Sequence, residues 1–253
     1  MNTHVAPAAD GMLESLPSLL AELDRLTCRP LWPGFEPGSV PVALAIDGDT
    51  FLLRHPSPPP EFVPLADRRD VLILRGLHPA MRANSVGIVG GVAIATVVVE
   101  SGPSSSRPIA ALIDHEAFHV FQRQHHPRWG GNEVDGLLYP VDDVEGLCLS
   151  LLEIDALRQA LGEASVMKAA RWTAIAMARR WARYLRLAPR FVTYERQTEL
   201  IEGLATYVEQ TALGRRDAVS IPDDGFAADD IRRRCYATGH AIAALLDRFL
   251  PGW

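Results

Sequence analysis

The chain has 253 residues, of which 48% are hydrophobic and 22% are charged, and its formal net charge is −6. These values are typical of a globular protein that buries a sizeable core, in one large domain or two small ones. The acidic balance argues against a nucleic-acid partner, because such proteins usually carry a basic face, and we interpret the short run Arg232-Arg233-Arg234 as a solvated helix face.

Before about residue 105, proline and glycine are frequent and the apolar runs are short and β-branched. An opening helix is predicted over residues 12–26. The segment HPSPPP at residues 55–60 excludes both helix and central strand. The apolar runs predict strands at residues 40–46, 50–53, 71–74, 86–89 and 92–99, the last two joined at Gly90-Gly91.

After a loop at residues 101–106, the apolar spacing becomes helical. Helices are predicted over residues 109–124, 142–161, 165–185, 190–213 and 229–250. The sequence therefore predicts an α+β protein. We expect a strand-rich N-terminal subdomain over residues 1–105 and a helical subdomain over residues 106–253, together forming one compact unit.

The cysteines and the N-terminal segment indicate where the protein resides. Cys28, Cys148 and Cys235 lie far apart and form no CxxC pair, which favours a reducing compartment. Acidic residues interrupt the N-terminal segment, so it does not resemble a signal peptide. The uncharged stretch at residues 83–99 is rich in valine and contains glycine, which favours buried strands over a membrane helix. We expect a cytoplasmic protein without a membrane partner.

The segment His115-Glu116-Ala117-Phe118-His119 has the pattern HExxH and falls inside a predicted helix. Helix positions i and i+4 share one face, so His115 and His119 can bind one Zn²⁺ ion. Glu116 could then take a proton from a metal-activated water and pass it to a leaving amine. With 8 histidines in the chain, the pattern arises by chance with a probability of about 0.014.

A catalytic zinc usually has three protein ligands and one open position, so a third ligand is expected elsewhere. The histidines after His119 do not have metzincin spacing. Glu195, Glu199 and Glu202 are spaced by four and three residues and share one face of a predicted helix. Gly203 costs that helix about 1 kcal/mol against alanine, which a close approach by another element, such as the HExxH helix, would explain.

These segments resemble the catalytic core of the gluzincin metallopeptidases, in particular the zinc aminopeptidase-like group of the peptidase MA-like clan. In that family the third zinc ligand lies in a stretch of the form NEGFAxY, and residues 202–207 here are EGLATY. The resemblance implies that Glu202 is the third ligand and that Thr206 forms a supporting hydrogen bond. Residues 236–239, YATG, are similar to the family's Tyr-x-x-Gly helix, which implies that Tyr236 donates to the oxyanion. A tyrosine packed with its hydroxyl at the surface is the alternative.

The resemblance also implies an edge strand along the substrate cleft. Residues 90–99 take that place, and such a strand binds a peptide by adding it to the sheet. The acidic residue that would hold a substrate's free amine is missing there. Glu202 follows His119 by 83 positions, which is longer than in typical aminopeptidases, so two inserted helices are expected. The resemblance covers residues 85–250 through three short motifs and leaves an aminopeptidase activity open.

Other polar residues have simpler interpretations. His125 and His126 end a helix, where a cation favours the dipole. His240 is expected to be packed or exposed, with a donor role in the cleft as the alternative. Asp114 is expected at the surface or as a helix-stabilising residue. Glu153 lies in an apolar helix and is the second candidate for a metal-binding or supporting carboxylate.

Three hypotheses about function remain open. The first is a zinc metallopeptidase that hydrolyses a peptide or protein substrate. The second is a zincin-like module that binds a peptide or protein without cleaving it, because fold and motif do not guarantee activity. The third is a structural helix pair without a metal. The sequence does not specify an oligomeric state.

Overall fold

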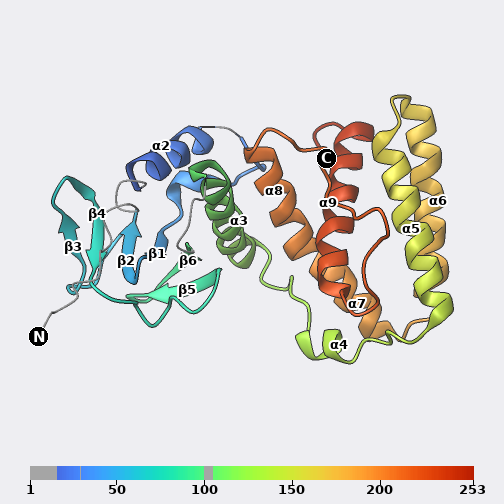
Figure 1. Ribbon diagram of the computed structural model, residues 1–253, viewed down its shortest axis with the longest axis horizontal. Helices are drawn as coiled ribbons and strands as arrows, with labels where there is room; N and C mark the ends of the chain where they lie inside the picture. Colours follow the sequence, from blue (N-terminus) through green and yellow to red (C-terminus); the bar gives the residue numbers. More distant parts are fainter. Residues whose placement is uncertain (1–15, 29, 100–104) are drawn as a thin grey trace, which may run out of the picture. The chain divides into compact units, whose positions relative to one another are not determined.

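The computed structural model describes residues 16–28, 30–99 and 105–253. Its contacts divide the chain into two compact units, Met1–Gln124 and His125–Trp253. The first unit contains a mixed β-sheet and the second is helical, which confirms the predicted α+β class (Figure 1).

The first unit is built on a sheet whose described strands have the order β3-β4-β2-β1-β6-β5. The strands are β1 (Val42–Ile46), β2 (Asp49–Leu53), β3 (Val63–Leu65), β4 (Arg68–Leu74), β5 (Ser85–Val89) and β6 (Val92–Val98). Neighbours are antiparallel, except that β1 and β6 are parallel. All predicted strands are present. Strand β3 was not predicted because it is short, contains Pro64 and buries little apolar surface.

Two hairpins of the sheet turn on residues with positive φ. Asp47 (φ 51°) and Gly48 (φ 81°) join β1 to β2, and Gly90 (φ 52°) and Gly91 (φ 79°) join β5 to β6. Positive φ at both central positions matches the twist of the flanking strands. The second hairpin places β5 at the sheet edge and β6 between β5 and β1. This corrects the expectation that the strand after Gly91 is the edge strand.

Helices α2 (Leu16–Thr27) and α3 (Ser106–His125) and the turn η1 (Pro37–Ser39) complete the described part of the first unit. The predicted opening helix corresponds to α2, and its residues before 16 lie outside the described ranges. Phe118 of α3 is fully buried, with its ring centroid 5.4 Å from that of Trp32 and 5.2 Å from that of Phe35. Because these contacts join α3 to the segment before β1, the division falls after α3 and not near residue 105.

The described helices of the second unit are α4 (Glu133–Leu137), α5 (Val144–Gly162), α6 (Val166–Tyr184), α7 (Pro189–Thr198), η2 (Glu199–Gly203), α8 (Leu204–Ala212) and α9 (Ile231–Phe249). Helices α5 and α6 lie side by side as a helical hairpin (Figure 1). The helix predicted over residues 190–213 is present, but its middle is the π-helical turn η2. Helix α4 was not predicted because it is a single short helix in a glycine-rich loop.

The core of the second unit lies where α5, α6 and α9 meet. Small and aliphatic side chains fill it: Ala156, Leu157, Ala160, Ala176, Ala241 and Leu245. Across the described ranges, no helix has both the length and the apolar character that a membrane crossing requires.

Candidate metal centre

His115 and His119 lie one turn apart on α3. Their ring centroids are 4.9 Å apart and their planes meet at 82°. His115 is buried and His119 is half-buried. The i, i+4 spacing of the motif therefore brings two imidazole rings together on one face of a regular helix.

Gln122, less than one turn after His119, orients the second imidazole. Nδ1 of His119 lies 2.8 Å from Oε1 of Gln122, whose side chain is buried. An amide oxygen only accepts hydrogen bonds, so Nδ1 carries the ring proton and Nε2 keeps its lone pair. Such a hydrogen bond fixes the ring and makes the other ring nitrogen a better metal ligand. The HExxH pattern does not include this residue, but its i+3 position relative to His119 could have identified it.

Two carboxylates flank His115 on the chain. Glu116 is buried. Asp114 is only 1% exposed, so the predicted surface position is wrong. Burial raises the pKa of Asp114 to about 7, although the nearby charge of Arg54 lowers it. Arg54 follows β2 with a positive φ of 56° and donates to the carbonyl of Pro37 at 2.8 Å. The charge interaction between Asp114 and Arg54 thus links α3 to the end of β2.

Glu153 and Glu199 belong to a buried cluster of arginines and carboxylates. Glu199 accepts from Nη1 and Nη2 of Arg180 at 2.8 and 2.6 Å, and from the hydroxyl of Thr238 at 2.6 Å. Glu153 accepts from Nε of Arg180 at 2.7 Å and from Nη2 of Arg183 at 2.9 Å. Both carboxylates are therefore held by guanidinium groups, which argues against either one as a metal ligand.

Glu195 extends this cluster. It accepts from Nη1 of Arg183 at 2.5 Å, from Nη2 of Arg234 at 2.9 Å and from the hydroxyl of Tyr139. Burial raises the pKa of Glu195, but the charges of Arg234 and Arg183 prevail and lower it to about 2. We call this cluster the Arg–Glu network, with the members Glu153, Glu195, Glu199, Arg180, Arg183 and Arg234. Its three carboxylates and three guanidinium groups balance in charge.

Glu202 is the one of the three aligned glutamates that lies outside the Arg–Glu network. Its Oε1 accepts from Nη2 of Arg232 at 2.6 Å. Tyr236 lies beside it, with the Arg232 guanidinium 5.8 Å from the centre of its ring. Burial and then the negative charge of Glu202 raise the pKa of Tyr236 well above its usual range, so its hydroxyl stays protonated. The structure therefore brings Glu202 and Tyr236 together with an arginine that the sequence alone placed on a solvated helix face.

Two glycines explain how Glu202 and Tyr236 meet. A Cβ at Gly203 would lie 2.5 Å from Cα of Gly239, and a Cβ at Gly239 would lie 2.7 Å from the carbonyl oxygen of Glu199. Only glycines allow η2 and α9 to cross at this distance. The predicted close approach at Gly203 is present, but its partner is α9 and not the HExxH helix.

The chain around Glu202 departs from a regular α-helix. Residues Glu199–Gly203 form a π-helical turn, a feature that often marks functional sites. The hydroxyl of Thr206 donates to the backbone carbonyl of Glu202 at 2.8 Å. Thr206 therefore supports the backbone at this turn, whereas the resemblance implies a role in supporting the ligand.

The remaining histidines in question have other contacts. His240 is 1% exposed and its Nε2 lies 2.7 Å from the carbonyl oxygen of Arg216, so it is packed, as predicted. His126 stacks on Trp129 with ring centroids 3.9 Å apart. His125 is the last residue of α3 and is exposed.

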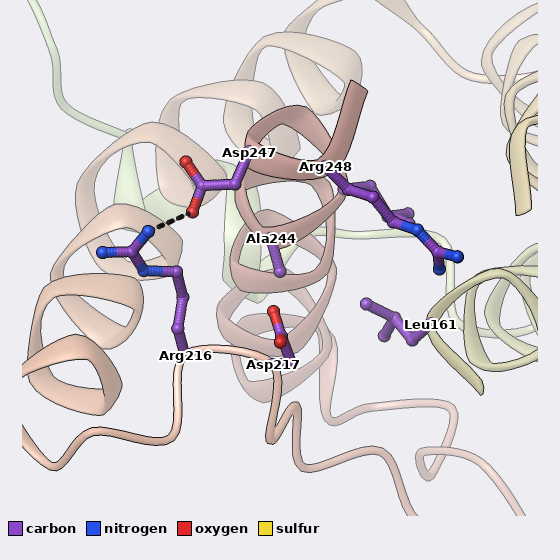
Figure 2. A pocket seen from close by; sticks show the side chains of 7 residues that line it. Leu161, Arg216, Asp217, Ala244, Asp247 and Arg248 are labelled. Carbon is purple, nitrogen blue, oxygen red and sulfur yellow. Dashed lines mark hydrogen bonds and ion pairs between the residues drawn. The ribbon is translucent and has the colours of Figure 1, made fainter. Parts of the chain in front are cut away.

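A separate pocket of about 430 Å³ lies beside the C-terminal part of α9 (Figure 2). It is lined by Leu161, Arg216, Asp217, Ala244, Leu245, Asp247 and Arg248. Figure 2 shows Arg216 turned toward Asp247, and the two are 3.0 Å apart. Arg248 donates to the backbone carbonyls of Ala160 and Ala164. Both guanidinium groups are engaged in contacts within the unit, and no predicted site residue lines this pocket, so it takes no part in the candidate site.

The predicted site residues thus fall into two groups. His115, Glu116 and His119 lie together on α3 in the first unit, and Glu202 and Tyr236 lie together in the second. No family model, curated protein or solved structure matches this chain.

Proposed function

We propose that the protein is a zinc-dependent metallopeptidase of the gluzincin type, with His115, His119 and Glu202 as the metal ligands. The observation that carries the proposal is that Glu202 and Tyr236, assigned to one active site from separate motifs, are neighbours in the second unit. Of the three aligned glutamates, only Glu202 lies outside the Arg–Glu network.

The donor set suits zinc. Two imidazole nitrogens and one carboxylate could hold a metal ion, and this combination is common in catalytic zinc sites, where a fourth position stays open. The hydrogen bond from Nδ1 of His119 to Gln122 supports the same assignment, because it fixes the imidazole ring and places the lone pair on Nε2. Bound zinc would polarise the substrate carbonyl and lower the pKa of a water molecule.

The other two residues carry the proton and stabilise charge. Glu116 takes a proton from the attacking water and passes it to the leaving amine. Tyr236 donates its hydroxyl hydrogen to the oxyanion of the tetrahedral intermediate, a role that its raised pKa supports. The described cysteines are free, and Cys28 and Cys148 are exposed, so we also propose a reducing, cytoplasmic setting.

Replacing Glu116 with Gln tests this mechanism. We expect hydrolysis of a peptide library to fall by about 10²–10⁴-fold while the zinc content stays unchanged. The control is Glu61→Gln, an exposed glutamate of the first unit, which should keep wild-type activity. A Glu116→Gln variant with full activity would show that the mechanism is wrong.

The second candidate is a zincin-like module that binds a peptide without cleaving it. The ion pair between Arg232 and Glu202 favours it, because the arginine competes with a metal for this carboxylate. That candidate predicts a wild-type protein that binds zinc and remains inert toward the same library.

A further inference from the structure

Arg232 contacts two carboxylates through different nitrogens. Nη2 donates to Glu202 at 2.6 Å, and Nη1 donates to Oε1 of Glu133 at 2.5 Å. The guanidinium also lies over the Tyr236 ring. One side of Arg232 therefore faces the proposed metal ligand, and its other side already holds a carboxylate of the kind that a substrate would bring.

Glu133 is a carboxylate that a solute can displace. Its side chain is 65% exposed and lies on the short helix α4, and the side chain of Arg232 is 46% exposed. Exposed ion pairs of this kind contribute only about 0–1 kcal/mol. The buried pair of Arg183 and Glu195, by contrast, has no such access to solvent. Arg232 is thus a cation that can exchange its partner.

The charge around Arg232 favours an anionic partner once a metal is bound. Arg232 forms ion pairs with Glu202 and Glu133, and a divalent metal would neutralise the first carboxylate. A guanidinium stays charged at all ordinary pH values and matches the two oxygens of a carboxylate. The next arginine along the helix, Arg233, pairs with Asp230 instead and is exposed.

We propose that Arg232 binds the C-terminal carboxylate of the substrate, so that the protein releases residues from the C-terminal end of peptides. This inference rests on the proposed function. Arg232 contacts both Glu202 and Tyr236, so a carboxylate bound to Arg232 lies beside the proposed metal ligand and the proposed oxyanion donor. The missing amine-binding acid agrees, because a site that recognises the C-terminus does not need it.

The test uses two small probes that differ only in the carboxylate. Mercaptoacetyl-phenylalanine binds zinc through its thiol and carries a free carboxylate, and its carboxamide lacks the charge. Calorimetry on the zinc-loaded full chain should show tighter binding of the acid by about 10–100-fold, the usual range for hydrogen bonds to charged groups. In Arg232→Ala the two affinities should become equal, and Arg232→Lys should restore part of the difference. Arg233→Ala is the matched control and should behave as wild type.

A second variant separates substrate binding from a purely supporting role of Arg232. Glu133→Gln removes the competing carboxylate, so it should strengthen binding of the acid several-fold and leave the carboxamide unchanged. Zinc content is measured for every variant. Equal affinities in the wild type, a preference that survives Arg232→Ala, or no gain in Glu133→Gln would each overturn the inference while the zinc enzyme stands. A wild-type protein that does not bind zinc would overturn both.

Discussion

The two groups of proposed ligands are supported in different ways. On α3, the helix itself spaces His115 and His119, and one hydrogen bond from Nδ1 of His119 to the amide oxygen of Gln122 orients a ring. In the second unit, Glu202 lies on a helix whose two other aligned glutamates are both bound by buried arginines. A histidine pair needs only a regular helix and an acceptor. A carboxylate ligand that lies among other carboxylates requires that cations neutralise those other carboxylates.

The Arg–Glu network therefore does more than hold helices together. Unpaired carboxylates beside Glu202 would repel one another and compete for a metal. Arg180 and Arg183 each bridge α5 to the helix that carries Glu202. The network thus holds that helix in place, and Glu202 is the one aligned glutamate that lies outside it.

The largest expected effect comes from breaking this network. Arg183→Met removes one of the two guanidinium partners of Glu153 and one of the two of Glu195, which leaves excess negative charge in the buried cluster. It should destabilise the second unit by about 3–5 kcal/mol. Arg186→Met is the control, because Arg186 forms exposed ion pairs with Asp143 and Glu145, and it should cost at most about 1 kcal/mol. Hydrogen exchange of α6 amides reports the difference. Equal protection of the α6 amides from exchange in both variants would show that the Arg–Glu network does not stabilise the second unit.

The second-largest effect is expected from low pH, which should lower the stability of the second unit. The folded-state pKa of Glu195 is about 2, below its ordinary value of 4.5. Its stabilising effect is fully present above the unfolded-state pKa and is lost as the pH falls from 4.5 to about 2. The shift corresponds to about 3 kcal/mol. Urea unfolding across this range, with wild type compared to Glu195→Gln, measures it. If the free energy of unfolding falls equally with pH in both proteins, Glu195 is not the cause of the acid sensitivity.

Gly203→Ala should have an intermediate effect. Its Cβ would meet the Gly239 backbone at 2.5 Å, and such overpacking costs about 1–3 kcal/mol. The displaced crossing should also separate Glu202 from Tyr236 and lower activity. Gly162→Ala is the control, since nothing lies within 4 Å of its Cβ. If both alanines leave thermal unfolding unchanged, the crossing does not require glycine.

Gln122→Leu should have the smallest effect and should act on metal binding. Loss of a hydrogen bond behind a metal-binding histidine usually lowers metal affinity by about 10–100-fold. Gln124→Leu, an exposed residue of the same helix, should leave the affinity unchanged. Competition with a zinc chelator measures both. A wild-type affinity in Gln122→Leu would mean that helix spacing alone is sufficient on the α3 side.

The sequence predicts the α3 side of the site better than the side in the second unit, because the first depends on local spacing and the second on contacts between distant residues. The HExxH pair, the main helices and most strands follow from local spacing, and these predictions agree with the structure. The partner of Gly203, the burial of Asp114 and the ion pairs of Arg232 depend on residues distant in the chain. Helix spacing alone did not separate Glu202 from Glu199. The resemblance of residues 202–207 to the family's motif singled out Glu202, and in the structure Arg180 of α6 binds Glu199.

The central claim is that this chain binds one catalytic zinc ion. The most direct test is the metal content of full-length protein purified without chelators, measured by inductively coupled plasma mass spectrometry. The account predicts about one zinc per chain in the wild type and its loss in Glu202→Ala. A zinc content near zero in the wild type, not restored by added zinc, would contradict it.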